Sequence, residues 1–77
     1  MNNLNEKLKQ LLQTTNHIIV KDDNQDLIKA GLDSIEVIKL ILAVEKEFNM
    51  KFSDEDLQMK YFQTFNSLYD FLDVKLK

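Results

Sequence analysis

A short run of residues near the middle of the sequence contains the side chains best suited to chemistry. Gly31 permits a backbone conformation that few other residues tolerate, just before a predicted helix. Asp33 can cap that helix by accepting hydrogen bonds from its first amide groups, and Glu36 follows three residues later, as in a capping box. Ser34 then falls at the first helical position, where its hydroxyl is expected to point outward.

The helix start would suit a phosphate group on Ser34. Free N–H groups and partial positive charge at a helix N-terminus stabilise an attached phosphate, and Asp33 could help to hold Mg²⁺ during phosphoryl transfer. An isolated Asp-Ser pair is usually only a helix start, so the surrounding pattern has to decide. A catalytic serine needs an oriented base and an oxyanion hole, and the loop placement of His17 gives no reason for it to approach this hydroxyl. We interpret His17 as a solvated loop residue.

The periodicity of apolar residues predicts the elements that position Ser34. These are a helix over 3–14, a loop over 15–32, a helix over 33–48 that ends at Asn49, a short helix after Ser53, and a last helix over 65–74 capped by Thr64. We therefore expect an all-α fold: a four-helix bundle, with three longer helices and one short, and a long loop between helices one and two. The residues expected in its core are Leu8, Ile38, Leu42, Phe48, Phe65, Leu68 and Leu72.

The chain has 77 residues, of which 44% are apolar and 30% are charged. This length leaves room for one folded domain, and we expect residues 1–77 to form it. About 60% of the surface of so short a chain can be buried, which is enough for one small core but not for a deep catalytic cavity. No constellation of side chains supports an enzyme, so we expect a protein that is not a catalyst.

The composition also excludes several kinds of site and partner. Without cysteine and with one histidine, the chain offers no thiolate or multi-histidine metal site, and we predict no metal site. A net charge of −3 and the absence of arginine argue against binding to nucleic acid. No apolar run approaches the ~18 residues of a membrane span, and the first residues lack the apolar segment of a signal peptide. We expect a cytoplasmic monomer.

The segment around Ser34 resembles the phosphopantetheine attachment site of acyl carrier proteins. The matching pattern is Asp26-Leu27-x-x-x-Gly31-x-Asp33-Ser34-Ile35, at the start of the second predicted helix. The resemblance extends over roughly residues 18–72, and the first predicted helix fits in place ahead of it. Further matching residues are Glu36, Leu40, Ala43, Val44, Glu45, Glu47, Phe48, Asp54 and Glu55.

This resemblance implies a carrier that has no active site of its own. A phosphopantetheinyl transferase would attach 4′-phosphopantetheine from coenzyme A to Ser34, with Asp33 assisting the Mg²⁺-dependent transfer. The thiol of the arm would hold acyl or aminoacyl groups as thioesters, and a loading enzyme and downstream synthases would exchange them. A chain without cysteine fits this role, because the reactive sulfur arrives with the cofactor. The alternative is an unmodified acidic helical module that binds a partner protein, in which Ser34 is only structural.

Partner enzymes must approach Ser34, so the neighbouring surface should carry their recognition. The resemblance implies docking through an acidic second helix, which makes Glu36 and Glu47 the candidate docking residues. Val37 and Ile41, if exposed, would make an apolar contact instead.

Two features depart from the carriers of fatty-acid synthesis. Lys39 and Lys46 interrupt the acidic second helix, and the segment 59–63 is longer and more aromatic than is typical. Both favour a dedicated pathway, such as that of an aminoacyl, aryl or D-alanyl carrier.

Overall fold

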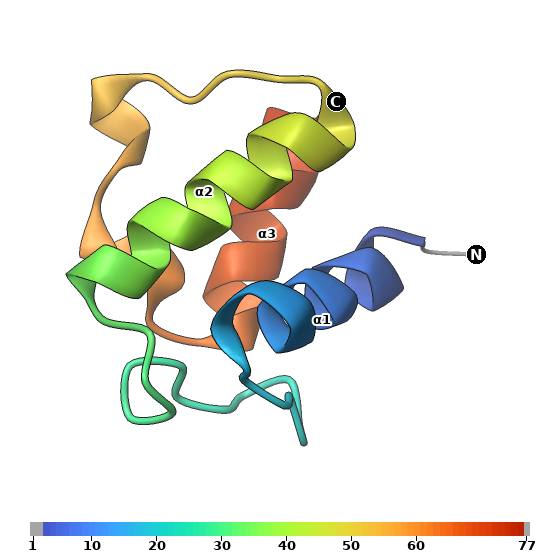
Figure 1. Ribbon diagram of the computed structural model, residues 1–77, viewed down its shortest axis with the longest axis vertical. Helices are drawn as coiled ribbons and strands as arrows, with labels where there is room; N and C mark the ends of the chain where they lie inside the picture. Colours follow the sequence, from blue (N-terminus) through green and yellow to red (C-terminus); the bar gives the residue numbers. More distant parts are fainter. Residues whose placement is uncertain (1–2, 77) are drawn as a thin grey trace.

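The computed structural model describes residues 3–76, and all its regular elements are helices. They are, in chain order, α1 (Asn3–Asn16), α2 (Ser34–Phe48), the 3₁₀ helices η1 (Asp54–Asp56) and η2 (Met59–Phe62), and α3 (Phe65–Lys75). In Figure 1 α2 lies in front of α3, with α1 beside them and the connection 17–33 looping below. The predicted all-α class is therefore confirmed. No helix within the described part of the chain is long and apolar enough to span a membrane.

The short fourth helix that is predicted after Ser53 is present only as 3₁₀ turns, so the four-helix bundle is confirmed only in part. The segment forms η1 and η2 instead. The N–H groups of Asp56 and Leu57, at η1, and that of Tyr61, in η2, each donate to a carbonyl three residues back. The backbone N–H of Ser53 donates to the carboxylate of Asp56 at 2.8 Å, which closes a single turn. A run this short gains too few hydrogen bonds to offset the cost of nucleating an α-helix, and 3₁₀ turns are the usual result.

The ends of the α-helices agree closely with their predicted signals. Thr64 caps α3 through a hydrogen bond from the N–H of Ser67 to its hydroxyl oxygen, at 3.1 Å. Asn49 ends α2 in the left-handed conformation, at φ 52°, as a residue at a helix C-terminus often does. The first helix runs two residues beyond its predicted end and α2 begins one residue later than predicted, so the connection is one residue shorter than expected.

One apolar core joins the three α-helices and the connection between α1 and α2. Its fully buried members come from α1, the connection, α2, η2 and α3, and four of the seven predicted core residues are among them. The buried apolar residues are Leu8, Leu12, Ile18, Leu27, Leu32, Val37, Leu40, Ile41, Val44, Phe62, Phe65, Leu68 and Leu72.

The prediction of which face of α2 is buried is wrong. Ile38 and Leu42 are 49% and 60% exposed, and Phe48 is only partly buried. The helix carries two apolar stripes, and the stripe through Leu40 and Val44 faces the core instead. Both stripes have helical spacing, so periodicity alone could not choose between them. The packing of α1 against α2 decides which of the two is buried.

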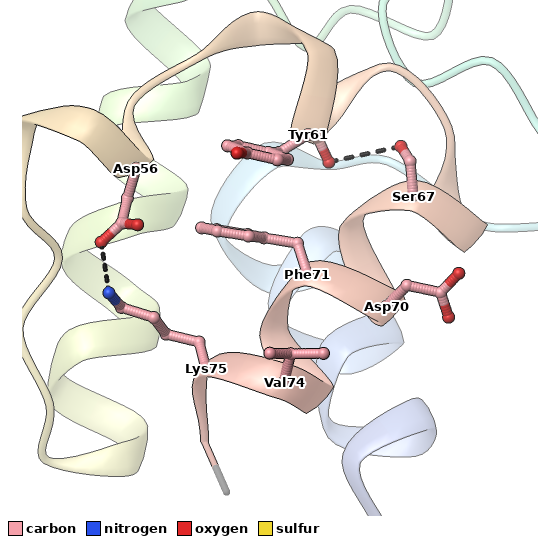
Figure 2. A pocket seen from close by; sticks show the side chains of 7 residues that line it. All are labelled: Asp56, Tyr61, Ser67, Asp70, Phe71, Val74 and Lys75. Atoms are coloured by element: carbon pink, nitrogen blue, oxygen red, sulfur yellow. Dashed lines mark hydrogen bonds and ion pairs between the residues drawn. The ribbon is translucent and has the colours of Figure 1, made fainter.

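The segment with the two 3₁₀ helices is fastened to α3. The rings of Tyr61 and Phe71 stack with their centroids 4.2 Å apart, and the Lys75 ammonium pairs with the Asp56 carboxylate at 2.7 Å (Figure 2). Tyr61 is thus part of the packing at the edge of the core. These contacts hold the segment in place without an α-helix.

The connection 17–33 is attached to the first turn of α3. The N–H of Leu27 donates to the carbonyl of Gln63 at 2.8 Å, and the N–H of Phe65 donates to that of Gln25 at 3.2 Å. The two bonds flank an isolated β-bridge between Asp26 and Thr64. The connection therefore supplies an acceptor for an early amide of α3, and these bonds hold it against the start of α3.

Candidate functional site

The sequence motif lies at the turn that leads into α2. Gly31 has φ +117°, which an L-residue adopts only with strain, so a glycine is required there. The N–H of Asp33 then donates to the Gly31 carbonyl at 2.9 Å. One carboxylate oxygen of Asp33 accepts from the N–H of Glu36 at 2.9 Å, which confirms its predicted role as the helix cap. Its second carboxylate oxygen has no hydrogen-bond partner among residues 3–76.

Ser34 is the first residue of α2 and is exposed. Its hydroxyl makes no hydrogen bond to any residue between 3 and 76, so it is available to an approaching reagent. The backbone N–H groups of Ser34 and Ile35 likewise have no acceptor within that range. The expected outward placement of the hydroxyl is confirmed.

Glu36 completes the site in a way that differs from the prediction. In a capping box its carboxylate would accept from the N–H of Asp33, but that N–H is already bonded to the turn. The Glu36 carboxylate instead accepts from the side-chain amide of Asn16 at 3.0 Å and from the Lys39 ammonium at 3.1 Å. The expected capping box is therefore only half formed.

Asn16 links the end of α1 to the first turn of α2. It is only 8% exposed, and its side-chain NH₂ donates both to the carboxylate of Glu36 and to its backbone carbonyl, the latter at 2.9 Å. Its own side-chain oxygen is buried without a partner among residues 3–76. The hydrogen bond from Asn16 is the main cause of a Glu36 pKa below its ordinary value of 4.5, and Lys39 adds to it.

Among the residues predicted to bind partner enzymes, two are inaccessible. Val37 and Ile41 are buried in the core, so the predicted apolar contact at these positions is wrong. Val37 and Ile41 lie on the side of α2 that faces the core, whereas Ile38 and Leu42, which are predicted to be in the core, are exposed. Glu47 is exposed and forms an ion pair with Lys7 of α1 at 2.8 Å. Docking through Glu36 and Glu47 stays a prediction.

Three apolar residues in the first two to three turns of α2 are exposed, which the sequence analysis does not predict. Ile35, Ile38 and Leu42 lie on α2, and each is at least 49% exposed. Their helical spacing also predicts burial, which the structure contradicts for Ile38 and Leu42. A usable signal was that α2 has more apolar positions than one inward stripe requires. His17 is exposed in the connection, as predicted.

Comparison with known proteins identifies the family. The family model described as phosphopantetheine attachment site matches residues 6–72. An acyl carrier protein from Buchnera aphidicola subsp. Schizaphis graminum is 30% identical over 80 residues, covering 100% of this chain and 99% of its own. Another, from Phytoplasma mali, is 34% identical over 76 residues and covers 87% of each chain. This chain belongs to the acyl carrier protein family.

The fold agrees with this membership. A solution structure of a holo acyl carrier protein from Nitrosomonas europaea superposes with a TM-score of 0.72, over 99% of this chain and 98% of that one. At 24% identity this match shows the fold alone. The cofactor of the family is a covalently attached 4′-phosphopantetheine.

The start of α2 fits such a group. The free hydroxyl of Ser34 offers an attachment atom, and the unpaired N–H groups of Ser34 and Ile35 can donate to phosphate oxygens. The partial positive charge at the helix N-terminus favours the added negative charge. When bound, the group supplies a thiol that holds the cargo as a thioester.

The protein also has a groove between the 3₁₀ segment and α3, away from Ser34. It has a volume of about 600 Å³ and is bounded by the stacked rings of Tyr61 and Phe71 and by the ion pair between Asp56 and Lys75 (Figure 2). None of its lining residues comes from α2. The groove is therefore separate from the start of α2, where the predicted attachment residue Ser34 lies.

Proposed function

We propose that Ser34 carries the 4′-phosphopantetheine arm and that the chain presents acyl or aminoacyl groups on it to partner enzymes. The observation that supports this most directly is the free, exposed Ser34 hydroxyl at the first position of a capped helix. In the attachment step the serine oxygen forms a bond to the phosphorus of phosphopantetheine, and the pyrophosphate bond of coenzyme A breaks. Adenosine 3′,5′-bisphosphate is the leaving group, and the serine proton passes to a base of the transferase.

We further propose that Asp33 assists this transfer. One of its carboxylate oxygens is committed to capping α2, and the other is free among residues 3–76 to meet a Mg²⁺ ion brought by the transferase and coenzyme A. The chain's own contribution is a capped helix start that presents the exposed serine. The catalytic groups belong to the transferase.

The carried group is proposed to belong to a dedicated pathway rather than to general fatty-acid synthesis. The support is the pair of lysines on α2, Lys39 and Lys46, at a surface where an acidic carrier would present carboxylates. Aminoacyl, aryl and D-alanyl groups are the candidate cargoes. Loading assays with purified adenylating enzymes for each class, followed by intact mass, would distinguish them.

Intact mass tests the attachment site itself. Incubation with coenzyme A, Mg²⁺ and a broad-specificity phosphopantetheinyl transferase should add one phosphopantetheine mass to the wild type and none to Ser34→Ala. Ser53→Ala is a matched control, because Ser53 also stands at a helix start and is exposed. This control should be modified like the wild type. Modification of Ser34→Ala, or none of the wild type, would refute the proposal and favour an unmodified interaction module.

A further inference from the structure

One exposed face of α2 contains apolar residues and lysines but no carboxylate. Successive residues of an α-helix turn by about 100°, so positions spaced by three, four, seven and eleven share one face. Five residues with this spacing form what we call the outer face of α2. They are Ile35, Ile38, Lys39, Leu42 and Lys46, and all five are exposed.

The carboxylates of α2 lie to either side of this outer face, and each is bonded within the molecule. Glu36 is held by Asn16 and Lys39. Glu45 accepts from the N–H of Phe52 at 2.9 Å, and Glu47 pairs with Lys7 of α1. The Glu47–Lys7 pair lies at the surface and can exchange partners at little cost, but Glu47 lies outside the outer face.

The two lysines of the outer face remain available. The Lys46 ammonium has no partner among residues 3–76. Lys39 is paired with Glu36 at 3.1 Å, but its side chain is 56% exposed, and such surface pairs exchange partners at little cost. The outer face thus presents apolar side chains beside positive charge.

From this arrangement we propose that partner enzymes dock on the outer face of α2 through an apolar patch rimmed by carboxylates. The proposal rests on the proposed function, because an enzyme that reaches an arm on Ser34 must lie beside Ile35, the next residue. Docking would remove apolar surface of both partners from water. Carboxylates of the enzyme opposite Lys39 and Lys46 would fix its orientation on α2. A basic patch would instead meet two like charges with no free carboxylate between them.

The test uses the full chain, with coenzyme A and a broad-specificity phosphopantetheinyl transferase as the probe enzyme. Intact mass first establishes that the wild type acquires the arm, and kcat/KM is then measured at low ionic strength, where charge effects are least screened. Leu42→Ser should lower kcat/KM about tenfold, the loss expected when one leucine no longer leaves water on docking. Val74→Ser is the matched control on α3, since Val74 is 72% exposed, and it should change kcat/KM less than about twofold.

A second pair of variants tests the charge of the partner. Lys46→Glu should lower kcat/KM, whereas Lys21→Glu, in the connection 17–33, should have little effect. A rise in kcat/KM with Lys46→Glu would overturn the proposal, because it would indicate a basic patch on the enzyme. Equal losses in Leu42→Ser and Val74→Ser would overturn it as well. A wild type that acquires no arm would refute the proposed function instead, and the mass measurement reveals that outcome before any variant is compared.

Discussion

Two leucines two residues apart on α2 provide a sharp test of which side of the helix is buried. Leu40 is fully buried in the core, whereas Leu42 is 60% exposed. Truncation of either leucine to alanine removes the same atoms from the same helix. The helix propensity of the two variants is therefore matched, and only the surroundings of the side chain differ.

The expected effects differ severalfold. Leu40→Ala should cost about 2.7–5 kcal/mol, the range for deleting a fully buried leucine and leaving a cavity. A domain of this size has a total stability of roughly 4–12 kcal/mol, so this loss is a large share of the total. Leu42→Ala should change the free energy of unfolding by about 0.5 kcal/mol or less, as exposed substitutions usually do.

Thermal and urea unfolding, followed by circular dichroism, measure both effects. At about 4–8 °C per kcal/mol, a loss of 3 kcal/mol in Leu40→Ala would lower the Tm by roughly 12–24 °C. The Tm of Leu42→Ala should stay within a few degrees of the wild type. If Leu42→Ala proved the more damaging variant, the assignment of the buried stripe would be refuted, and with it the outer face of α2 as a docking surface.

Two further predictions concern the contacts that hold the site and the 3₁₀ segment. Asn16→Ala should lower the free energy of unfolding by about 1 kcal/mol or more in urea titrations, because two hydrogen bonds of a buried amide are lost, while the exposed Gln13→Ala serves as control. The pKa values of Glu36 and Asp56 are lowered from 4.5 and 3.8, chiefly by hydrogen bonds from Asn16 and Lys75. As the pH falls, the two carboxylates are protonated at a higher pH in the unfolded chain than in the folded protein. The stability that they contribute is therefore present well above pH 4.5 and 3.8, and it is lost as the pH falls below these values toward the lowered pKa values of the folded protein. The Tm of Glu36→Gln should fall less between neutral and acid pH than that of the wild type, and an equal fall would contradict this origin of the pH dependence.

Local signals in the sequence determined the candidate site and most helix ends. Gly31, Asp33 and Thr64 each act through bonds to residues within a few positions, so their roles follow from residue type and order. The attachment motif, with Ser34 at the first helical position, was readable for the same reason. Short-range geometry depends little on the rest of the fold.

The surface that surrounds the serine was decided only by tertiary structure. Both apolar stripes of α2 satisfy the helical period, and the contact with α1 selects the stripe that is buried and leaves Ile38 and Leu42 in water. The partner of Glu36 is Asn16, twenty positions away in the sequence, and no local rule connects the two. Packing and charge pairing between distant segments act through space. They therefore determine which side chains a partner enzyme meets, although the sequence alone indicates where the arm is expected.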